Sequence, residues 1–317
     1  MLPPTCDALA ARLDNPQQNG LAVSALLSGQ LLFAALVVGS VYVIIALGLN
    51  LVFGTMRLLD AAHGDVVMLG AYTSFWLFTL VGMPPLLSML IAGGLCAGLG
   101  VAVYRGLFRR LLADTRLPRR LEGNSLLVFF GISIILQNFA ALCFDTTPRA
   151  YLYLDGVIRV GNLAMTENRL AELATAAILC VIIFLFLRFH IYGLAIKALI
   201  QNRQAAAVVG VNIERIQLLS FAIGFGLAGI AGSLISMTEQ ITPFMGFPFT
   251  IAAFVTVILG GLGNLIRGMA AGMFLGFVEI YGVALTSSSL DSVLIYGVFI
   301  VVLYLQSQDF LGGRQKS

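Results

Sequence analysis

Long hydrophobic segments separated by short polar breaks dominate the chain. A transmembrane helix needs about 20 mostly apolar residues, and nine stretches approach that requirement: residues 31–53, 66–81, 86–104, 126–144, 171–187, 218–237, 249–262, 269–285 and 293–305. This pattern predicts an all-α, polytopic transmembrane helical bundle of about eight to nine membrane segments. The 66–81 and 249–262 segments are short, so we expect a tilted span, a half-helix or a re-entrant piece at each.

One polar island, QNRQAAAVVGVNIERIQ at residues 201–217, interrupts the hydrophobic pattern. Asn202 can cap a helix, the following Gln-Ala-Ala-Ala run favours helix, and Gly210 suits the left-handed position that ends one. Asn212 can then cap a second helix. The island therefore predicts a short helix, a stop and a second helix start.

The short helix of the island carries a small apolar stripe. Ala205, Val208 and Val209 share one face at spacings of three and four. This stripe is too weakly apolar to hold a bilayer surface, but it suits a groove on another protein. We therefore predict a docking helix.

Composition supports a membrane protein. Hydrophobic residues make up 59% of the 317 residues and charged ones 10%, with 34 glycines and one tryptophan, and the mean hydropathy is +0.98, which is typical of polytopic helical membrane proteins. We expect an extracytoplasmic or interfacial segment at 1–28, without a cleaved signal peptide. A transmembrane domain should follow at 29–306, and a cytoplasmic tail at 307–317.

Basic residues orient the predicted spans. Residues 105–120 contain six arginines, and such clusters stay on the cytoplasmic side. With nine crossings, the island with Arg203 and Arg215 and the turn at Arg267 fall on the same side. The loop at 145–169 carries both signs and falls outside. No basic run with interleaved aromatics indicates nucleic acid.

Several polar side chains are expected at membrane depth, where a charge costs about 2.5–3.5 kcal/mol at a helix centre. Glu279 can either make a structural hydrogen bond or take part in a path or gate. Gln137 and Asn138 favour hydrogen bonds between helices, with a path role as the alternative.

Asp60, His63 and Asp65 cluster where the first span meets the second, and they join the candidates for the path or gate. Carboxylates around a histidine also suit a metal or acid/base site. A second histidine is missing from the spacing, so we favour capping of the next helix by Asp60 or Asp65 and a hydrogen bond from His63 to exposed backbone. The four cysteines show no metal-ligand spacing. No Walker A, GxSxG or HExxH motif occurs, so we expect neither an enzyme nor a metal site.

Small residues at every fourth position predict close helix packing. They form two sets, Gly94 and Gly98, and Gly268, Gly272 and Gly276. The alternative is that some of these flat faces form a seam with a second subunit.

Three stretches resemble the H-type inner-membrane permease subunits of the high-affinity branched-chain amino acid ABC importers. Residues 39–72, GSVYVIIALGLNLVFGTMRLLDAAHGDVVMLGAY, are similar to the family's long N-terminal signature. Residues 260–276, GGLGNLIRGMAAGMFLG, give a second match. In the island, Gln204, Ala205, Ala206 and Gly210 stand at the family's E-A-A and G positions. The resemblance covers about residues 30–305.

The resemblance implies that the chain forms one half of a translocation path in the bacterial inner membrane and has no energy source of its own. It implies a second homologous permease, two cytoplasmic ATPase subunits that use ATP, and a periplasmic solute-binding protein, with no cofactor on this chain. The ATPase-coupling loop would consist of Asn202, Arg203, Gln204, Ala205, Ala206, Val209 and Gly210. Gln204 replaces the family's acid, and the C-terminal Arg-Pro-x-Gly pattern is missing, so an ATPase salt bridge at 204 and the tail's role are in question.

Other functions stay open on the sequence. Related permeases serve urea, short amides and other amino acids, and nothing in the helices names the solute. An ion-coupled secondary transporter could use Asp60, Asp65 and Glu279 as ion sites. A membrane-embedded enzyme could be built around Asp60, His63 and Asp65.

Overall fold

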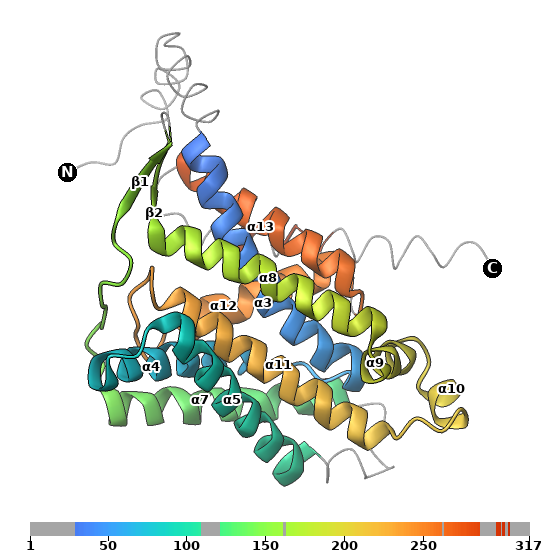
Figure 1. Cartoon of the computed structure of the whole chain (residues 1–317). Coiled ribbons are helices and arrows are strands. Elements are labelled where there is room, and N and C mark those ends of the chain that lie inside the picture. Colours follow the sequence, from blue (N-terminus) through green and yellow to red (C-terminus); the bar gives the residue numbers. More distant parts are fainter. Residues whose placement is uncertain are drawn as a thin grey trace, which may run out of the picture.

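The computed structural model describes residues 29–108, 121–160, 163–261 and 263–285, together with 296–298, 300, 301 and 304. This part of the chain forms a bundle of helices (Figure 1). Seven of them are long and apolar enough to cross a membrane. These are α3 (Gly29–Met56), α4 (His63–Val81), α5 (Pro85–Val103) with its π-helical extension η1 (Tyr104–Phe108), α7 (Leu121–Phe144), α8 (Glu167–Phe189), α11 (Ile213–Ile235) and α13 (Leu265–Leu285).

Helices α3 and α11 form the centre of the bundle. Both are apolar on nearly all sides and mostly buried, as expected for helices surrounded by other helices. Helix α11 packs against α3, α4 and α5, while α3 packs against α13 and against the shorter α12 (Gly246–Gly260). Glycines allow the close approach: a Cβ on Gly48 of α3 would lie 2.7 Å from the Gly224 carbonyl oxygen of α11.

The glycine repeat of α13 faces α3. Gly268, Gly272 and Gly276 are all buried. A Cβ on Gly268 would lie 2.7 Å from Asn50 Nδ2, and one on Gly272 would lie 2.9 Å from the Val43 backbone nitrogen. This face brings the two backbones together, as the spacing predicts.

The expectation for Gly94 and Gly98 is wrong within the described part of the chain. Both are exposed, and a Cβ on either would meet nothing within 4 Å. The reason is the rotation of α5, which presents Gly93 and Gly100 to α11 instead: their added Cβ atoms would contact Ile230 and Phe225. Gly94 and Gly98 therefore lie on an outward face.

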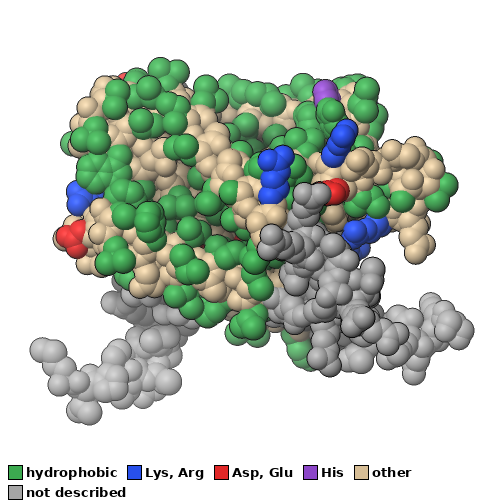
Figure 2. All heavy atoms as spheres, turned by 90° about the horizontal axis from the view of Figure 1, so that it is seen from below, with side chains coloured by type: hydrophobic (Ala, Val, Ile, Leu, Met, Phe, Trp, Pro, Cys, Tyr) green, Lys and Arg blue, Asp and Glu red, His purple; other side chains and the backbone are tan. Residues whose placement is uncertain are grey.

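Helices α7 and α8 lie at the edge of the bundle and expose hydrophobic side chains. On α7, Leu127, Ile135 and Leu142 are 74%, 67% and 87% exposed. Figure 2 shows one face of the molecule on which hydrophobic side chains are widespread and charged side chains are few. Such a surface suits lipid or a partner subunit.

One end of the bundle carries a small hairpin and a tied loop. Strands β1 (Val157–Val160) and β2 (Leu163–Thr166) pair antiparallel, and β2 leads into α8. The loop before them pairs with the chain after α11, because Arg149 and Ile241 exchange backbone hydrogen bonds of 3.0 and 2.8 Å. Tyr151 shares a hydrogen bond of 2.7 Å with Ser236, and burial raises the pKa of its hydroxyl to about 12. The loop is therefore fixed to the bundle.

The predicted fold class is confirmed: the protein is an all-α, polytopic membrane bundle. The two segments that are short in the sequence pattern form helices of different length: α4 starts at His63 and has 19 residues, whereas α12 has 15. The hairpin and the short helix α9 (Ile191–Gln201) were not predicted. The predictions for 1–28 and 307–317, and most of the 293–305 segment, fall outside the described residues.

Candidate functional site

The polar island forms a short helix that projects from one end of the bundle. Helix α10 (Arg203–Val208) stands between α9 and α11 and lies at the margin of the molecule (Figure 1). Ala205 is exposed, as are Val208 at 86% and Val209 at 76%. The predicted apolar stripe is thus open in the described part of the chain, where a partner could contact it.

Local capping explains this conformation, and the three predicted caps are confirmed. Asn202 Oδ1 accepts a hydrogen bond of 3.0 Å from the Ala205 N–H, and Asn212 Oδ1 accepts one of 3.0 Å from the Arg215 N–H. Gly210 has φ +85°, a left-handed conformation that residues with a Cβ avoid. Each turn around α10 is therefore specified by its own residues.

A single buried residue anchors α10 to the bundle. Ala206 is 2% exposed and belongs to the hydrophobic core, and its carbonyl oxygen accepts a hydrogen bond of 3.0 Å from the Val211 N–H. The preceding helix, α9, contacts α8, α3 and α11, while α10 contacts α9 and α11. Arg203 and Gln204 are exposed. A force on α10 would consequently act on two helices that reach into the core.

The same end of the bundle collects the other basic turns. Tyr104, next to Arg105, donates a hydrogen bond of 3.4 Å from its hydroxyl to the Glu214 carbonyl oxygen beside Arg215. The turn before Arg267 packs on the base of α9, since a Cβ on Gly263 would lie 3.0 Å from Ile200. The hairpin and the loop at 145–156 lie at the opposite end. Among the described residues, Arg105, Arg215 and the turn before Arg267 thus lie at one end of the bundle.

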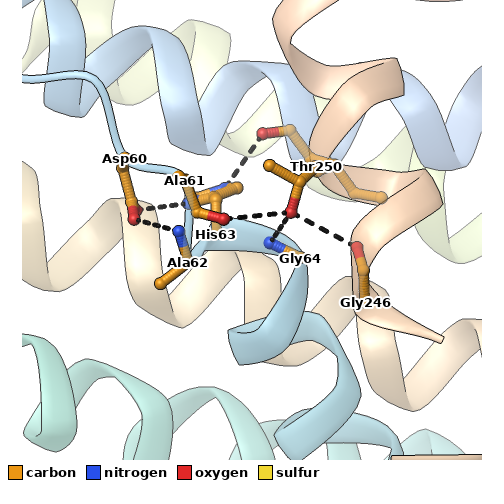
Figure 3. Close-up of polar contacts among 8 residues, drawn as sticks. Asp60, Ala61, Ala62, His63, Gly64, Gly246 and Thr250 are labelled. Atoms are coloured by element: carbon orange, nitrogen blue, oxygen red, sulfur yellow. Dashed lines mark hydrogen bonds and ion pairs between the residues drawn. The ribbon is translucent and has the colours of Figure 1, made fainter. Parts of the chain in front are cut away.

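A second polar cluster occupies the junction between α3 and α4 (Figure 3). His63 Nδ1 lies 3.1 Å from Asp60 Oδ2, and His63 Nε2 lies 3.2 Å from the Ile45 carbonyl oxygen of α3. Both side chains are fully buried. Asp60 Oδ1 also accepts a hydrogen bond of 3.1 Å from the Ala62 N–H. Asp60 and His63 therefore stabilise the turn between α3 and α4.

Thr250 of α12 completes this junction. Its hydroxyl oxygen accepts a hydrogen bond of 3.0 Å from the Gly64 N–H and lies 3.4 Å from the Ala61 carbonyl oxygen (Figure 3). Orphan backbone groups at the start of α4 are thereby satisfied by a neighbouring helix. The expected capping by Asp60 or Asp65 is only partly met: the cap residue is Ala62, without a side-chain cap bond.

Asp65 takes part in a different contact. Its Oδ1 accepts a hydrogen bond of 2.9 Å from Gln137 Nε2 of α7, and Gln137 Nε2 lies 3.2 Å from Ser133 Oγ. The predicted bond between helices therefore forms at Gln137. It does not form at Asn138, which is exposed and donates to the Ile134 carbonyl oxygen of its own helix at 2.8 Å. Asn138 points away from α4 because it follows Gln137 by one residue, about 100° around the helix.

Glu279 is separate from this junction. It lies near the far end of α13, partly buried, and lines a cavity with residues of α3, α8 and α12. The structure thus brings together Asp60 with His63 and Asp65 with Gln137, and it leaves Glu279 at the end opposite α10. Within the described ranges, no group of three or more His, Cys, Asp or Glu could hold a metal ion.

Sequence reasoning missed two polar residues that fix the bundle near these sites. Asn50, six residues before the end of α3, accepts a hydrogen bond of 2.8 Å from the Gly263 N–H and donates one of 3.1 Å to the Asn264 carbonyl oxygen. Thr250 joins α12 to α4. A lone asparagine within an apolar run was a usable signal, because a polar group at membrane depth requires a partner.

Comparison with known proteins identifies the family. Residues 31–303 match the family described as branched-chain amino acid transport system, permease component. The permease LivH of Escherichia coli strain K12 is 30% identical over 297 residues, covering 89% of this chain and 95% of LivH. BraD of Pseudomonas aeruginosa is 30% identical over 298 residues, with the same coverage.

The second permease type is also similar. LivM of Escherichia coli strain K12 is 29% identical over 259 residues, which is 71% of this chain and 57% of LivM. No solved structure matches. The family match spans α3 to α13 and includes the projecting α10. The chain therefore belongs to the permease components of branched-chain amino acid transport systems.

Proposed function

We propose that this chain forms one half of an ATP-driven path that imports branched-chain amino acids across the bacterial inner membrane, and that α10 receives the motion of an ATPase subunit. The exposed stripe of Ala205, Val208 and Val209 carries the proposal, because a capped and anchored helix with an apolar face in the open is suited to a groove on a protein. Residues 202–210 then form the coupling element.

The position of α11 supports a direct transmission of force. It begins four residues after Val209, runs through the centre of the bundle and packs against α3, α4 and α5. Packed helices switch between discrete arrangements rather than deforming gradually. A displacement of α10 by a closing ATPase pair would therefore shift the helices that border the path, exchanging outward-facing and inward-facing states.

The proposed partners follow from the relatives. Similarity to both LivH and LivM supports pairing with a second, homologous permease. Two cytoplasmic ATPase subunits would bind and use the ATP, and this chain would bind no cofactor. A periplasmic solute-binding protein would dock at the end that carries the hairpin and supply most of the selectivity. The alternative is that the imported solute is urea or a short amide.

The test replaces Gly210 by isoleucine. At φ +85° a β-branched side chain strains the stop after α10, at a cost of roughly 1–3 kcal/mol, and so displaces the coupling element. In proteoliposomes containing the complete complex, we expect ATP hydrolysis to continue while leucine uptake falls at least tenfold. The measurement is uptake of labelled leucine per ATP hydrolysed.

Gly82→Ile is the matched control. Gly82 ends α4 with φ +71°, and a Cβ there meets nothing within 4 Å, as at Gly210. The control carries the same backbone strain away from α10 and should keep its coupling ratio. Coupled uptake by Gly210→Ile at the control's level would contradict the assigned role of α10. Uptake that a protonophore stops while ATP is present would instead indicate a secondary transporter.

A further inference from the structure

A cavity opens at the end of the bundle opposite α10. It lies between the start of α3, the first turns of α8, the chain after α11 and the far ends of α12 and α13. Its volume of about 100 Å³ exceeds the roughly 10–15 Å³ that one water requires, so the cavity can hold a group of several non-hydrogen atoms.

The cavity contains a buried carboxylate with an unused oxygen. Glu172 of α8 is 3% exposed and lines the cavity. Among the described residues, no group forms a hydrogen bond with its Oε2. A buried carboxylate oxygen without a donor is costly, so this atom marks the place where a ligand can donate. The ammonium group of a small solute can supply such a hydrogen-bond donor.

Four of the other lining residues complement the rest of a zwitterion, while Glu239 and Glu279 add two further carboxylates to the lining. Arg169 lies three residues before Glu172 on the same face of α8 and lines the cavity, so a cationic guanidinium stands beside the buried carboxylate. Val38, Val41 and Phe249 form an aliphatic and aromatic wall of the cavity. Guanidinium groups bind carboxylates through paired hydrogen bonds. Positive, negative and apolar surfaces thus meet in one small space.

We propose that this cavity binds a zwitterionic aliphatic amino acid as it is released into the permease, an inference that rests on the proposed function and assigns its solute a first site on this chain. The ammonium group donates to Glu172 Oε2, the carboxylate lies on Arg169, and the side chain lies on the wall of Val38, Val41 and Phe249. A metal ion is not the favoured occupant, because the described carboxylates do not form a group of three that could hold one.

The experiment measures binding to the complete permease–ATPase complex in nanodiscs, without the binding protein and without ATP. Three probes that share one isobutyl side chain separate the contacts: leucine, isoamylamine, which lacks the carboxylate, and 4-methylpentanoate, which lacks the ammonium. Glu172→Gln should weaken leucine and isoamylamine at least tenfold and spare 4-methylpentanoate. Arg169→Gln should weaken leucine and 4-methylpentanoate by a similar factor and spare isoamylamine, since each removes one charge-assisted contact.

Glu167→Gln is the control, because Glu167 lies on the first turn of α8 but does not line the cavity. The leucine affinity of this control should equal that of the unaltered complex. ATP hydrolysis stimulated by leucine-loaded binding protein shows that each variant has folded. Leucine affinity unchanged by both Glu172→Gln and Arg169→Gln would overturn the proposal, as would no leucine binding by the unaltered complex. If leucine binds and depends on Glu172 but is not imported, the site stands and the proposed function fails.

Discussion

At the scale of single residues, the buried side chains of Asp60 and His63 satisfy backbone groups at the junction of α3 and α4. His63 uses one ring nitrogen for Asp60 and the other for the Ile45 carbonyl oxygen, and Asp60 also holds the Ala62 N–H. These hydrogen bonds join the start of α4 to α3, and Thr250 of α12 adds one to the Gly64 N–H. A membrane-embedded enzyme would need a reactive group that faces a substrate, and this pair is fully enclosed.

His63→Leu tests that reading. The substitution removes the partner of Asp60 Oδ2 in a fully buried site, which costs about 1–3 kcal/mol of unfolding free energy. Asp60→Asn keeps an acceptor for the Ala62 N–H and should cost less. Thermal melting of the purified complex in detergent measures both.

The paired substitution gives the decisive comparison. Because the two residues share one contact, His63→Leu combined with Asp60→Leu should destabilise the protein by clearly less than the sum of the single changes. Strict additivity would show that the pair is not coupled. Loss of transport with unchanged melting in His63→Leu would instead favour a direct role in the path.

At the scale of elements, close backbone contacts at glycines set which helix faces meet. Gly232 of α11 lies so near the Val67 carbonyl of α4 that an added Cβ would overlap its oxygen. Two neighbouring glycines of α5 differ in this respect, since Gly93 faces α11 whereas Gly94 faces outward. The contact is therefore decided by the rotation of the helix and not by the presence of a small residue.

Gly232→Ala should separate α4 from α11 and destabilise the bundle by roughly 1–3 kcal/mol, the usual cost of overpacking. Gly94→Ala is the matched control and should leave the melting temperature unchanged, because its Cβ enters open space. Both are measured as melting of the purified complex in detergent. Equal melting of the two variants would refute the packing arrangement. A loss of assembly with the second permease in Gly94→Ala would place that outward face at the subunit seam.

The elements that sequence predicts well are those whose signals are local. The caps at Asn202 and Asn212 and the stop at Gly210 are each specified within four residues, and all three form as expected. Helix α4 begins at His63 rather than Val66 because its first turn is stabilised by Thr250, 186 residues away from Gly64. No local pattern contains that information.

At the scale of the whole molecule, the proposed coupling element and the proposed solute cavity lie at opposite ends of one buried helix. Helix α11 starts beside the projecting α10 and finishes beside the cavity that contains Glu172. Both ends are therefore joined by the element with the largest buried share among the predicted spans. A displacement at α10 could reach the cavity through α11 alone, without a chain of intermediate contacts.

Sequence reasoning predicted the first of these two regions but not the second. The island is visible because it is polar between apolar segments. Glu172 and Arg169 lie at the start of an apolar segment, where charged residues normally flank a span, so they gave no signal. The burial of Glu172 results from the packing of α8 against α3, which the local sequence does not show.

The central claim, that α10 faces the cytosol and contacts an ATPase subunit, is tested most directly by side-specific labelling of Ala205→Cys in a variant whose native cysteines are replaced. Residue 205 is exposed on α10, so a membrane-impermeant maleimide can reach it from one side of the membrane. We predict labelling in inside-out vesicles stripped of the ATPases and protection when the ATPases are added back. Labelling only in right-side-out vesicles, or labelling that the ATPases do not alter, would contradict the account.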